Sequence, residues 1–198
     1  GVDLSIMAAT KYIVGHSDAV LGTVSASKRA WESLKKFHFN MGLFVSPDDV
    51  TLALRGMRTL DIRLERHYKN ATTVAKWLET RDEVEVVYYP ALESHPQHQL
   101  WKRDFRGASG LLSFVTKPSS QAAADALLDS LSLFSIGYSW GGFESLAMIA
   151  DPKAIRSATS WEIDGHLVRL HIGLEDPFDL IEDLEKGFEE FNSLRNKP

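Results

Sequence analysis

The chain has 198 residues, of which 44% are hydrophobic and 25% are charged, a composition that is typical of folded globular domains and excludes collagen-like and low-complexity classes. It has no cysteine and a formal net charge of −5, which excludes disulfides and thiolate sites and argues against a dedicated nucleic-acid binder. Because no apolar run approaches the roughly 18–20 residues of a membrane-spanning helix, we expect no membrane partner and a cytoplasmic location.

Two short strands and a helix are predicted near the start of the chain. Residues 2–9 and 19–26 are apolar runs on either side of the polar turn 10–18, and we expect both to be strands buried on two faces. Ser27 suits the N-cap of a helix that begins directly after it. This order indicates a segment of α/β type.

The clearest helix start lies at Ser46 and Pro47, which two aspartates follow. Serine is a good N-cap, proline fits the first helical position, and the acids complement the helix dipole. Apolar residues then recur at steps of three and four to about Thr80, which predicts one long helix with a bend at Gly56. A helix of that length is typical of a connection between domains, so we place a domain boundary near residue 57.

Strand and helix patterns alternate after this helix in the manner of an α+β domain. Strands are predicted at 83–88, 110–115, 133–138, 145–149 and 167–172, and helices at 119–131 and from Asp176 onward. We therefore expect an α/β segment over residues 1–57 and an α+β domain over residues 58–198.

Lys11 is the first candidate for chemistry. It directly follows a predicted strand and shares its turn with Thr10 and His16. A lysine that is partly desolvated at a strand end can act as a nucleophile toward carbonyl groups. Taken alone, an exposed loop lysine is the commoner interpretation, and His16 suits a hydrogen bond within the turn.

Arg169 is the second candidate, because it lies inside an alternating apolar strand where an unpaired charge is costly. One interpretation is an ion pair with Glu175 or Asp176. The other is a binding site for a carboxylate, which a guanidinium can hold with two parallel hydrogen bonds. For His95 and His98 we predict no metal site, since no cysteine or His-Glu-x-x-His motif accompanies them.

Residues 3–17, DLSIMAATKYIVGHS, resemble the lysine signature of the transsulfuration family of pyridoxal-phosphate enzymes of cysteine and methionine metabolism. The resemblance implies that Lys11 binds pyridoxal 5'-phosphate covalently and that Thr10 donates a hydrogen bond to its phosphate. Some members have a serine for the same purpose where this chain has Ala8, so one phosphate contact is absent or moved.

Two further segments carry the resemblance. Residues 138–146, YSWGGFESL, are similar to a loop on the family's substrate side, and residues 168–176, VRLHIGLED, are similar to its carboxylate-binding segment. The resemblance implies that Arg169 and Ser139 hold the substrate carboxylate, and that Trp140 and Tyr138 shape the side-chain channel.

Trp140 bears on the choice of reaction, because many members have leucine there while tryptophan is typical of bacterial members that act as cystathionine β-lyases. The resemblance therefore favours a carbon–sulfur lyase that cleaves L-cystathionine to homocysteine, pyruvate and ammonia. A γ-acting relative, such as a cystathionine γ-lyase, a γ-synthase or a methionine γ-lyase, and a catalytically silent fragment are the alternatives.

The resemblance covers nearly the whole chain and implies a fold type I pyridoxal-phosphate enzyme. Residues 1–57 would be the end of the large α/β cofactor domain and residues 58–198 the small C-terminal α+β domain. The resemblance also implies a homo-oligomer, with a dimer of dimers expected, and an amino-acid substrate. We expect these residues to be the C-terminal half of a chain about twice as long, and to be inactive alone.

Overall fold

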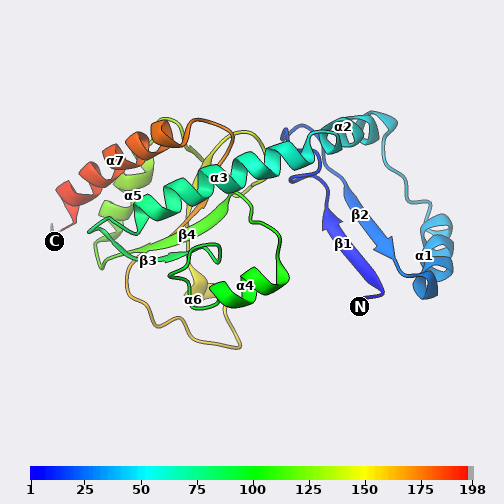
Figure 1. Cartoon of the computed structure of the whole chain (residues 1–198), viewed down its shortest axis with the longest axis horizontal. Helices are drawn as coiled ribbons and strands as arrows, with labels where there is room; N and C mark the ends of the chain where they lie inside the picture. The colour runs from blue at the N-terminus through cyan, green and yellow to red at the C-terminus, as the bar shows by residue number, and fades with distance from the viewer. Residues whose placement is uncertain (196–198) are drawn as a thin grey trace.

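The computed structural model describes residues 1–195, and Figure 1 shows them as two parts joined by a long helix. The first part contains β1 (Leu4–Ala8), β2 (Gly22–Ala26), α1 (Lys28–Asn40) and α2 (Pro47–Met57). The connecting helix is α3 (Leu60–Leu78), and the second part lies around its C-terminal portion. No helix within residues 1–195 is both long enough and apolar enough to cross a membrane.

Strands β1 and β2 form an antiparallel pair in which Leu4 lies opposite Ala26. No residue of either strand is buried, so the expectation of strands buried on two faces is wrong for the described chain. The physical reason is that each strand pairs only with the other, and no layer within residues 1–195 covers either face. Val14, Ala19 and Ala53 form the buried apolar cluster of this part, and Ala9 is buried as well.

The predicted long helix is divided into α2 and α3. As predicted, α2 begins at Pro47, and the Ser46 hydroxyl accepts a hydrogen bond from the second residue of the helix. The division falls at Arg58 and Thr59, just after Gly56, where we predicted a bend. Gly56 itself allows close packing, because a Cβ atom there would overlap the carbonyl oxygens of the turn after β1.

The second part is built on a five-stranded sheet with the order β3–β4–β7–β6–β5. Its strands are β3 (Val84–Tyr88), β4 (Leu111–Thr116), β5 (Ser135–Ile136), β6 (Leu146–Ala150) and β7 (Leu167–His171). Neighbours are antiparallel except for β5 and β6, which are parallel. Its helices are α4 (His98–Asp104), α5 (Gln121–Asp129), α6 (Pro152–Ile155) and α7 (Pro177–Leu194).

The main core lies between this sheet and helices α3, α5 and α7. Strand β7 shows how the sheet separates core from site. Val168 and Leu170 are fully buried in the core, whereas Arg169 and His171 alternate with them and therefore project from the opposite side of the strand. Arg169 and His171, on that opposite side, belong to the candidate functional site.

Candidate active site

The turn that follows β1 presents Lys11. Its backbone N–H donates to the Ala8 carbonyl at 3.2 Å, and its carbonyl accepts from Gly15 N–H at 2.8 Å. Gly15 has φ of 73°, a left-handed conformation that favours glycine. His16 Nδ1 lies 2.7 Å from the Val14 carbonyl oxygen, in agreement with the predicted hydrogen bond within the turn.

Arg63 joins this turn to helices α2 and α3. The side chain is buried, and it donates to the carbonyls of Ile13 at 3.3 Å and Gly56 at 2.8 Å and to the Thr59 hydroxyl at 3.1 Å. Burial lowers the pKa of the Arg63 guanidinium, because the charged form loses hydration. Arg63 therefore attaches the turn that contains Lys11 to the first turn of α3.

Side chains from three separate segments meet at Lys11. Its Nζ donates to the Ser139 hydroxyl at 3.0 Å and lies 4.5 Å from the centre of the Trp140 ring. The Arg169 guanidinium carbon lies 5.5 Å from the same ring, and Arg169 donates to the Tyr138 carbonyl at 2.6 Å. The structure thus brings Lys11, Arg169 and the loop over residues 138–142 together. The Tyr138 side chain itself is 79% exposed.

The ion pair that we considered for Arg169 is not formed within residues 1–195, since neither Glu175 nor Asp176 is paired with it. The Glu175 carboxylate instead accepts from the backbone N–H and the hydroxyl of Ser145, at 2.7 and 3.0 Å. Asp176 accepts from Phe178 N–H and caps α7. Within residues 1–195, the Arg169 guanidinium therefore bonds to the Tyr138 carbonyl and forms no ion pair with a carboxylate.

The other two sequence-predicted residues, Thr10 and Ala8, flank Lys11: the Ala8 carbonyl accepts from the Lys11 N–H, and the Thr10 hydroxyl bonds to Leu21. The Thr10 hydroxyl accepts from Leu21 N–H at 3.0 Å and donates to the Leu21 carbonyl at 3.2 Å. Ala8, the last residue of β1, is exposed. To donate to a phosphate, Thr10 would have to give up its bond to the Leu21 carbonyl.

Sequence reasoning missed a buried aromatic cluster behind Lys11, formed by Tyr12, His67 and His171. The ring centres are 5.3 Å apart for Tyr12 and His67, 5.9 Å for Tyr12 and His171, and 5.2 Å for the two histidines. Burial raises the pKa of Tyr12, lowers that of His67 and lowers that of His171 to about 4. The alternation of Arg169 and His171 along one strand was the signal that could have identified this cluster.

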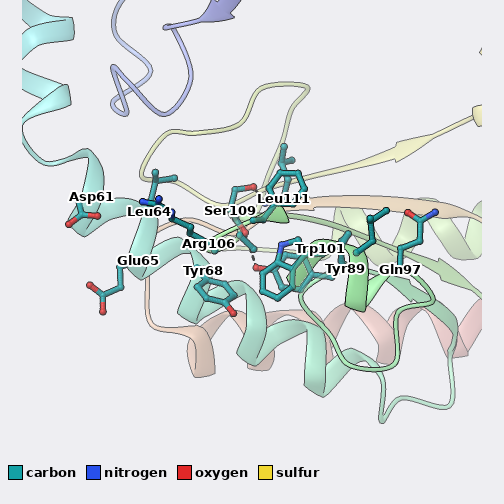
Figure 2. Close-up of a pocket in the computed structure, with 15 residues that line it drawn as sticks. Asp61, Leu64, Glu65, Tyr68, Tyr89, Gln97, Trp101, Arg106, Ser109 and Leu111 are labelled. Carbon is teal, nitrogen blue, oxygen red and sulfur yellow. Dashed lines mark hydrogen bonds between the residues drawn. The ribbon is translucent and has the colours of Figure 1, made fainter. Parts of the chain in front are cut away.

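A pocket of about 820 Å³ lies apart from Lys11, beside α3 and α4. Figure 2 shows Tyr68 and Trp101 among its lining residues, with ring centres 6.3 Å apart, and the Tyr89 hydroxyl donates to the Ser109 carbonyl at 3.0 Å. None of the residues that meet at Lys11 lines this pocket. Its lining is mostly aromatic and aliphatic, and it holds no arrangement of groups comparable to the lysine site.

Comparison with known proteins identifies the family of the chain. Residues 1–189 match the model of the Cys/Met metabolism PLP-dependent enzyme family. The chain therefore belongs to this family, and the family's cofactor is pyridoxal 5'-phosphate.

Individual relatives resemble the chain over almost its full length. The cystathionine β-lyase MetC of Escherichia coli is 48% identical over 95% of the chain and 49% of its own length. A Rhizobium johnstonii protein provisionally named cystathionine β-lyase is 53% identical over 95% of the chain and 48% of its own length. The chain thus spans about half the length of these curated relatives.

A solved structure supports the fold. The cystathionine γ-synthase of Xanthomonas oryzae pv. oryzae, crystallised in complex with cystathionine, is 38% identical, with a TM-score of 0.85 over 98% of this chain and 51% of that one. The prediction of an α/β, fold type I pyridoxal-phosphate enzyme is confirmed by this likeness and by the family match.

The described residues fit the cofactor at one end of the site. Lys11 Nζ is partly exposed and its polar contact is a neutral hydroxyl, so the amine is accessible for covalent attachment. A polar hydroxyl and an aromatic ring lie within reach of the same amine. The fit rests on Lys11, Ser139 and Trp140, while Thr10 contributes to the turn that holds the lysine.

Proposed function

We propose that the protein is a carbon–sulfur lyase that cleaves L-cystathionine with water to homocysteine, pyruvate and ammonia. One observation carries the proposal. Lys11 contacts Ser139 and the Trp140 ring, although both lie more than a hundred residues away from it in the sequence, and Arg169 lies against the same ring. An amine, a hydroxyl and a guanidinium in this arrangement suit an amino-acid substrate that reacts at its α-carbon.

When bound, pyridoxal phosphate supplies an electron sink that stabilises negative charge on the substrate's α-carbon. We assign to Lys11 both the covalent attachment of the cofactor and the removal of the α-proton by its Nζ. The Ser139 hydroxyl, 3.0 Å away, orients this amine by accepting its hydrogen bond. A base that is held in position contributes typically about 10²–10⁴-fold to rate.

Arg169 is the proposed ligand of the substrate carboxylate. Its planar guanidinium can donate two parallel hydrogen bonds, which fixes the orientation of the α-carbon as well as its position. Trp140 lies against both Lys11 and Arg169, and its face attracts cations. We assign to Trp140 and Tyr138 the walls of the channel that receives the rest of the substrate.

A γ-acting relative is the second candidate, and the likeness to a cystathionine γ-synthase favours it. The same scaffold can support both reactions, so the fold does not discriminate between them. The β-lyase proposal is supported by Trp140 and by the higher identity to the E. coli β-lyase. The products discriminate, because β-cleavage of cystathionine yields pyruvate whereas γ-cleavage yields 2-oxobutyrate.

We also propose that the complete site uses groups outside this chain. The resemblance implies a carboxylate for the cofactor's pyridine nitrogen, an aromatic ring stacked on it, and a glycine-containing phosphate loop. We expect the part of the relatives' length that this chain does not span to supply these groups. A homo-oligomeric holoenzyme, with a dimer of dimers expected, is supported by the exposed apolar side chains of β1, α1 and α2.

The test is a product assay on the holoenzyme with cystathionine. We expect pyruvate from the wild type and a loss of more than about 10³-fold in kcat for Lys11→Ala, because one amine binds the cofactor and removes the proton. The exposed Lys69→Ala is the matched control and should retain activity. Near-normal turnover by Lys11→Ala would refute the assignment, and 2-oxobutyrate from the wild type would favour the γ-acting alternative.

A further inference from the structure

Strand β7 holds the loop over residues 138–142 at two points. At the start of the loop, Arg169 donates to the Tyr138 carbonyl at 2.6 Å. At its end, His171 Nε2 lies 3.1 Å from the backbone nitrogen of Gly141 and 3.2 Å from the carbonyl oxygen of Gly142. Ser139 and Trp140, which contact Lys11, lie between these two points.

The second point of attachment, at Gly141, also packs directly against the main chain of Lys11. Gly141 has φ of 87°, and a Cβ atom there would lie 2.7 Å from the Tyr12 nitrogen and 2.8 Å from the Lys11 carbonyl carbon. The loop backbone therefore packs against the main chain of the lysine itself. Because His171 bonds to Gly141, a displacement at this bond would move both Ser139 and the contact surface of Lys11.

His171 is suited to accept the Gly141 hydrogen bond. The side chain is 1% exposed, and burial keeps the imidazole neutral by lowering its pKa to about 4. The groups that face it are His67 from α3, Glu144 from the loop before β6, Arg169 from β7 and Tyr12 from the lysine turn.

Only one ring nitrogen of a neutral imidazole carries a proton. The Gly141 N–H points at Nε2 with good hydrogen-bond geometry, which requires a lone pair on Nε2. A proton on Nε2 would set two donors against each other. We therefore assign the proton to Nδ1, which has no hydrogen-bond partner within residues 1–195, and in this tautomer the Gly142 carbonyl, 3.2 Å from Nε2, receives no hydrogen bond from the ring.

We propose that His171 is a positioning residue, which holds the loop over residues 138–142 against Lys11 while Arg169 binds the substrate. The proposal rests on the function proposed above, in which Arg169 grips the substrate carboxylate. Arg169 then weakens its bond to the Tyr138 carbonyl, and the bond from Gly141 to His171 remains as the attachment of the loop to β7. His171 acts through Ser139 and Lys11 and touches neither cofactor nor substrate.

The test compares two variants of the holoenzyme. His171→Gln can place an amide oxygen near the position of Nε2, whereas His171→Leu has similar bulk and cannot accept a hydrogen bond. We expect His171→Leu to raise the hydrogen-exchange rate of the Gly141 amide about tenfold, in line with the loss of a buried hydrogen bond. His171→Gln should restore most of the protection.

Kinetics supply the second measurement. We expect kcat for His171→Leu to fall about tenfold, while KM changes less than about threefold, because Arg169 stays on β7 and still binds the carboxylate. His171→Gln should recover kcat. The matched control is His166→Gln, which should change neither kcat nor the Gly141 exchange rate.

Unchanged Gly141 exchange in His171→Leu, or no restoration by His171→Gln, would overturn the proposal. The third measurement needs no variant: ¹⁵N NMR of the wild type at pH 7 reports which ring nitrogen is protonated, and a proton on Nε2 would also overturn it. The exchange and NMR results do not depend on turnover. A holoenzyme without lyase activity would therefore refute the proposed function, while these two measurements would still decide the role of His171.

Discussion

Without substrate, Arg169 forms a hydrogen bond with the loop over residues 138–142. Its short bond to the Tyr138 carbonyl satisfies a charge that would otherwise be costly in an apolar strand. The carbonyl is a neutral acceptor, so a carboxylate can replace it with a stronger, charge-assisted pair of bonds. The free site is therefore held close to the geometry that an anionic substrate requires.

We predict that Arg169→Ala weakens substrate use far more than cofactor retention. Removal of one partner of a buried charged pair typically costs about 2–5 kcal/mol, which should appear as a fall in kcat/KM. Arg169→Lys should restore only part of the loss, because an ammonium group lacks the planar fork. The absorbance of bound cofactor is measured alongside, with Arg103→Ala as the control. An unchanged kcat/KM in Arg169→Ala would contradict the assignment.

The depressed pKa of His171 predicts a pH dependence of stability. Its value of about 4 in the folded chain lies below the 6.5 of an unperturbed histidine, so between these values the unfolded state binds a proton that the folded state does not. Stability is therefore full above pH 6.5 and falls by about 3 kcal/mol as the pH drops to 4.

The measurement is the free energy of unfolding in urea at pH 7 and near pH 4.5, for the wild type and His171→Gln. The glutamine variant should lose less stability over this interval, because it lacks the titrating group. Other groups titrate equally in both proteins, so the difference between the two isolates His171. Equal losses in the two proteins would contradict the prediction.

Among the elements, α2 shows how a single glycine allows the lysine turn to pack. The Gly56 carbonyl accepts from Arg63 at 2.8 Å, and the missing side chain leaves space for the carbonyl oxygens of Ile13 and Val14. Helix α2, the Arg63 side chain and the lysine turn therefore pack against one another at Gly56.

We predict that Gly56→Ala destabilises the chain by about 2 kcal/mol, the range expected for overpacking. In an unconstrained helix the same change would stabilise by up to about 1 kcal/mol, so the sign of the effect is diagnostic. Thermal unfolding measures it. A higher melting temperature in the variant would show that the turn can move away from α2 without cost.

The elements that the sequence predicts well are those with a local signal, such as a helix cap. Elements that depend on pairing with distant strands are predicted less well. Capped helices such as α2 and α7 begin where Ser46 and Asp176 indicate, because a cap is a local interaction. The strand predicted at 133–138 is reduced to Ser135 and Ile136, since it pairs with β6 alone at the edge of the sheet. Helix α4 was not predicted, because seven residues are too few to show a helical period.

The candidate site also contains residues that local motifs indicate and contacts that only the fold creates. Lys11 and Arg169 could be proposed as site residues because their neighbours along the chain form recognisable motifs, and their roles stay predictions. The contacts of Lys11 with Ser139 and of Gly141 with His171 join distant segments, and no local pattern encodes such distances. Tyr12 and His67 read as ordinary residues of a turn and a helix until the fold places their rings together.

At the scale of the whole molecule, the two parts differ greatly in buried apolar surface. The core around the five-stranded sheet contains twenty-two buried apolar side chains, whereas the apolar cluster in the part with β1 and β2 contains three, namely Val14, Ala19 and Ala53. The domain boundary near residue 57 remains a prediction, and this separation of the two clusters supports it. A two-stranded sheet with so small a core is only marginally stable in water.

We therefore predict that the 198-residue chain opens in two steps, with the N-terminal part first. Backbone amides of β1 and β2 should exchange about a hundredfold faster than those of β4 and β7, because local opening requires less free energy where fewer apolar contacts are lost. Hydrogen exchange followed by mass spectrometry measures both sets in one sample. Binding of pyridoxal phosphate to Lys11 should slow exchange in β1 selectively, because the lysine turn joins β1 to the Gly141 loop. Equal exchange rates in the two sheets would show that the chain unfolds as one cooperative unit and would contradict the boundary at residue 57.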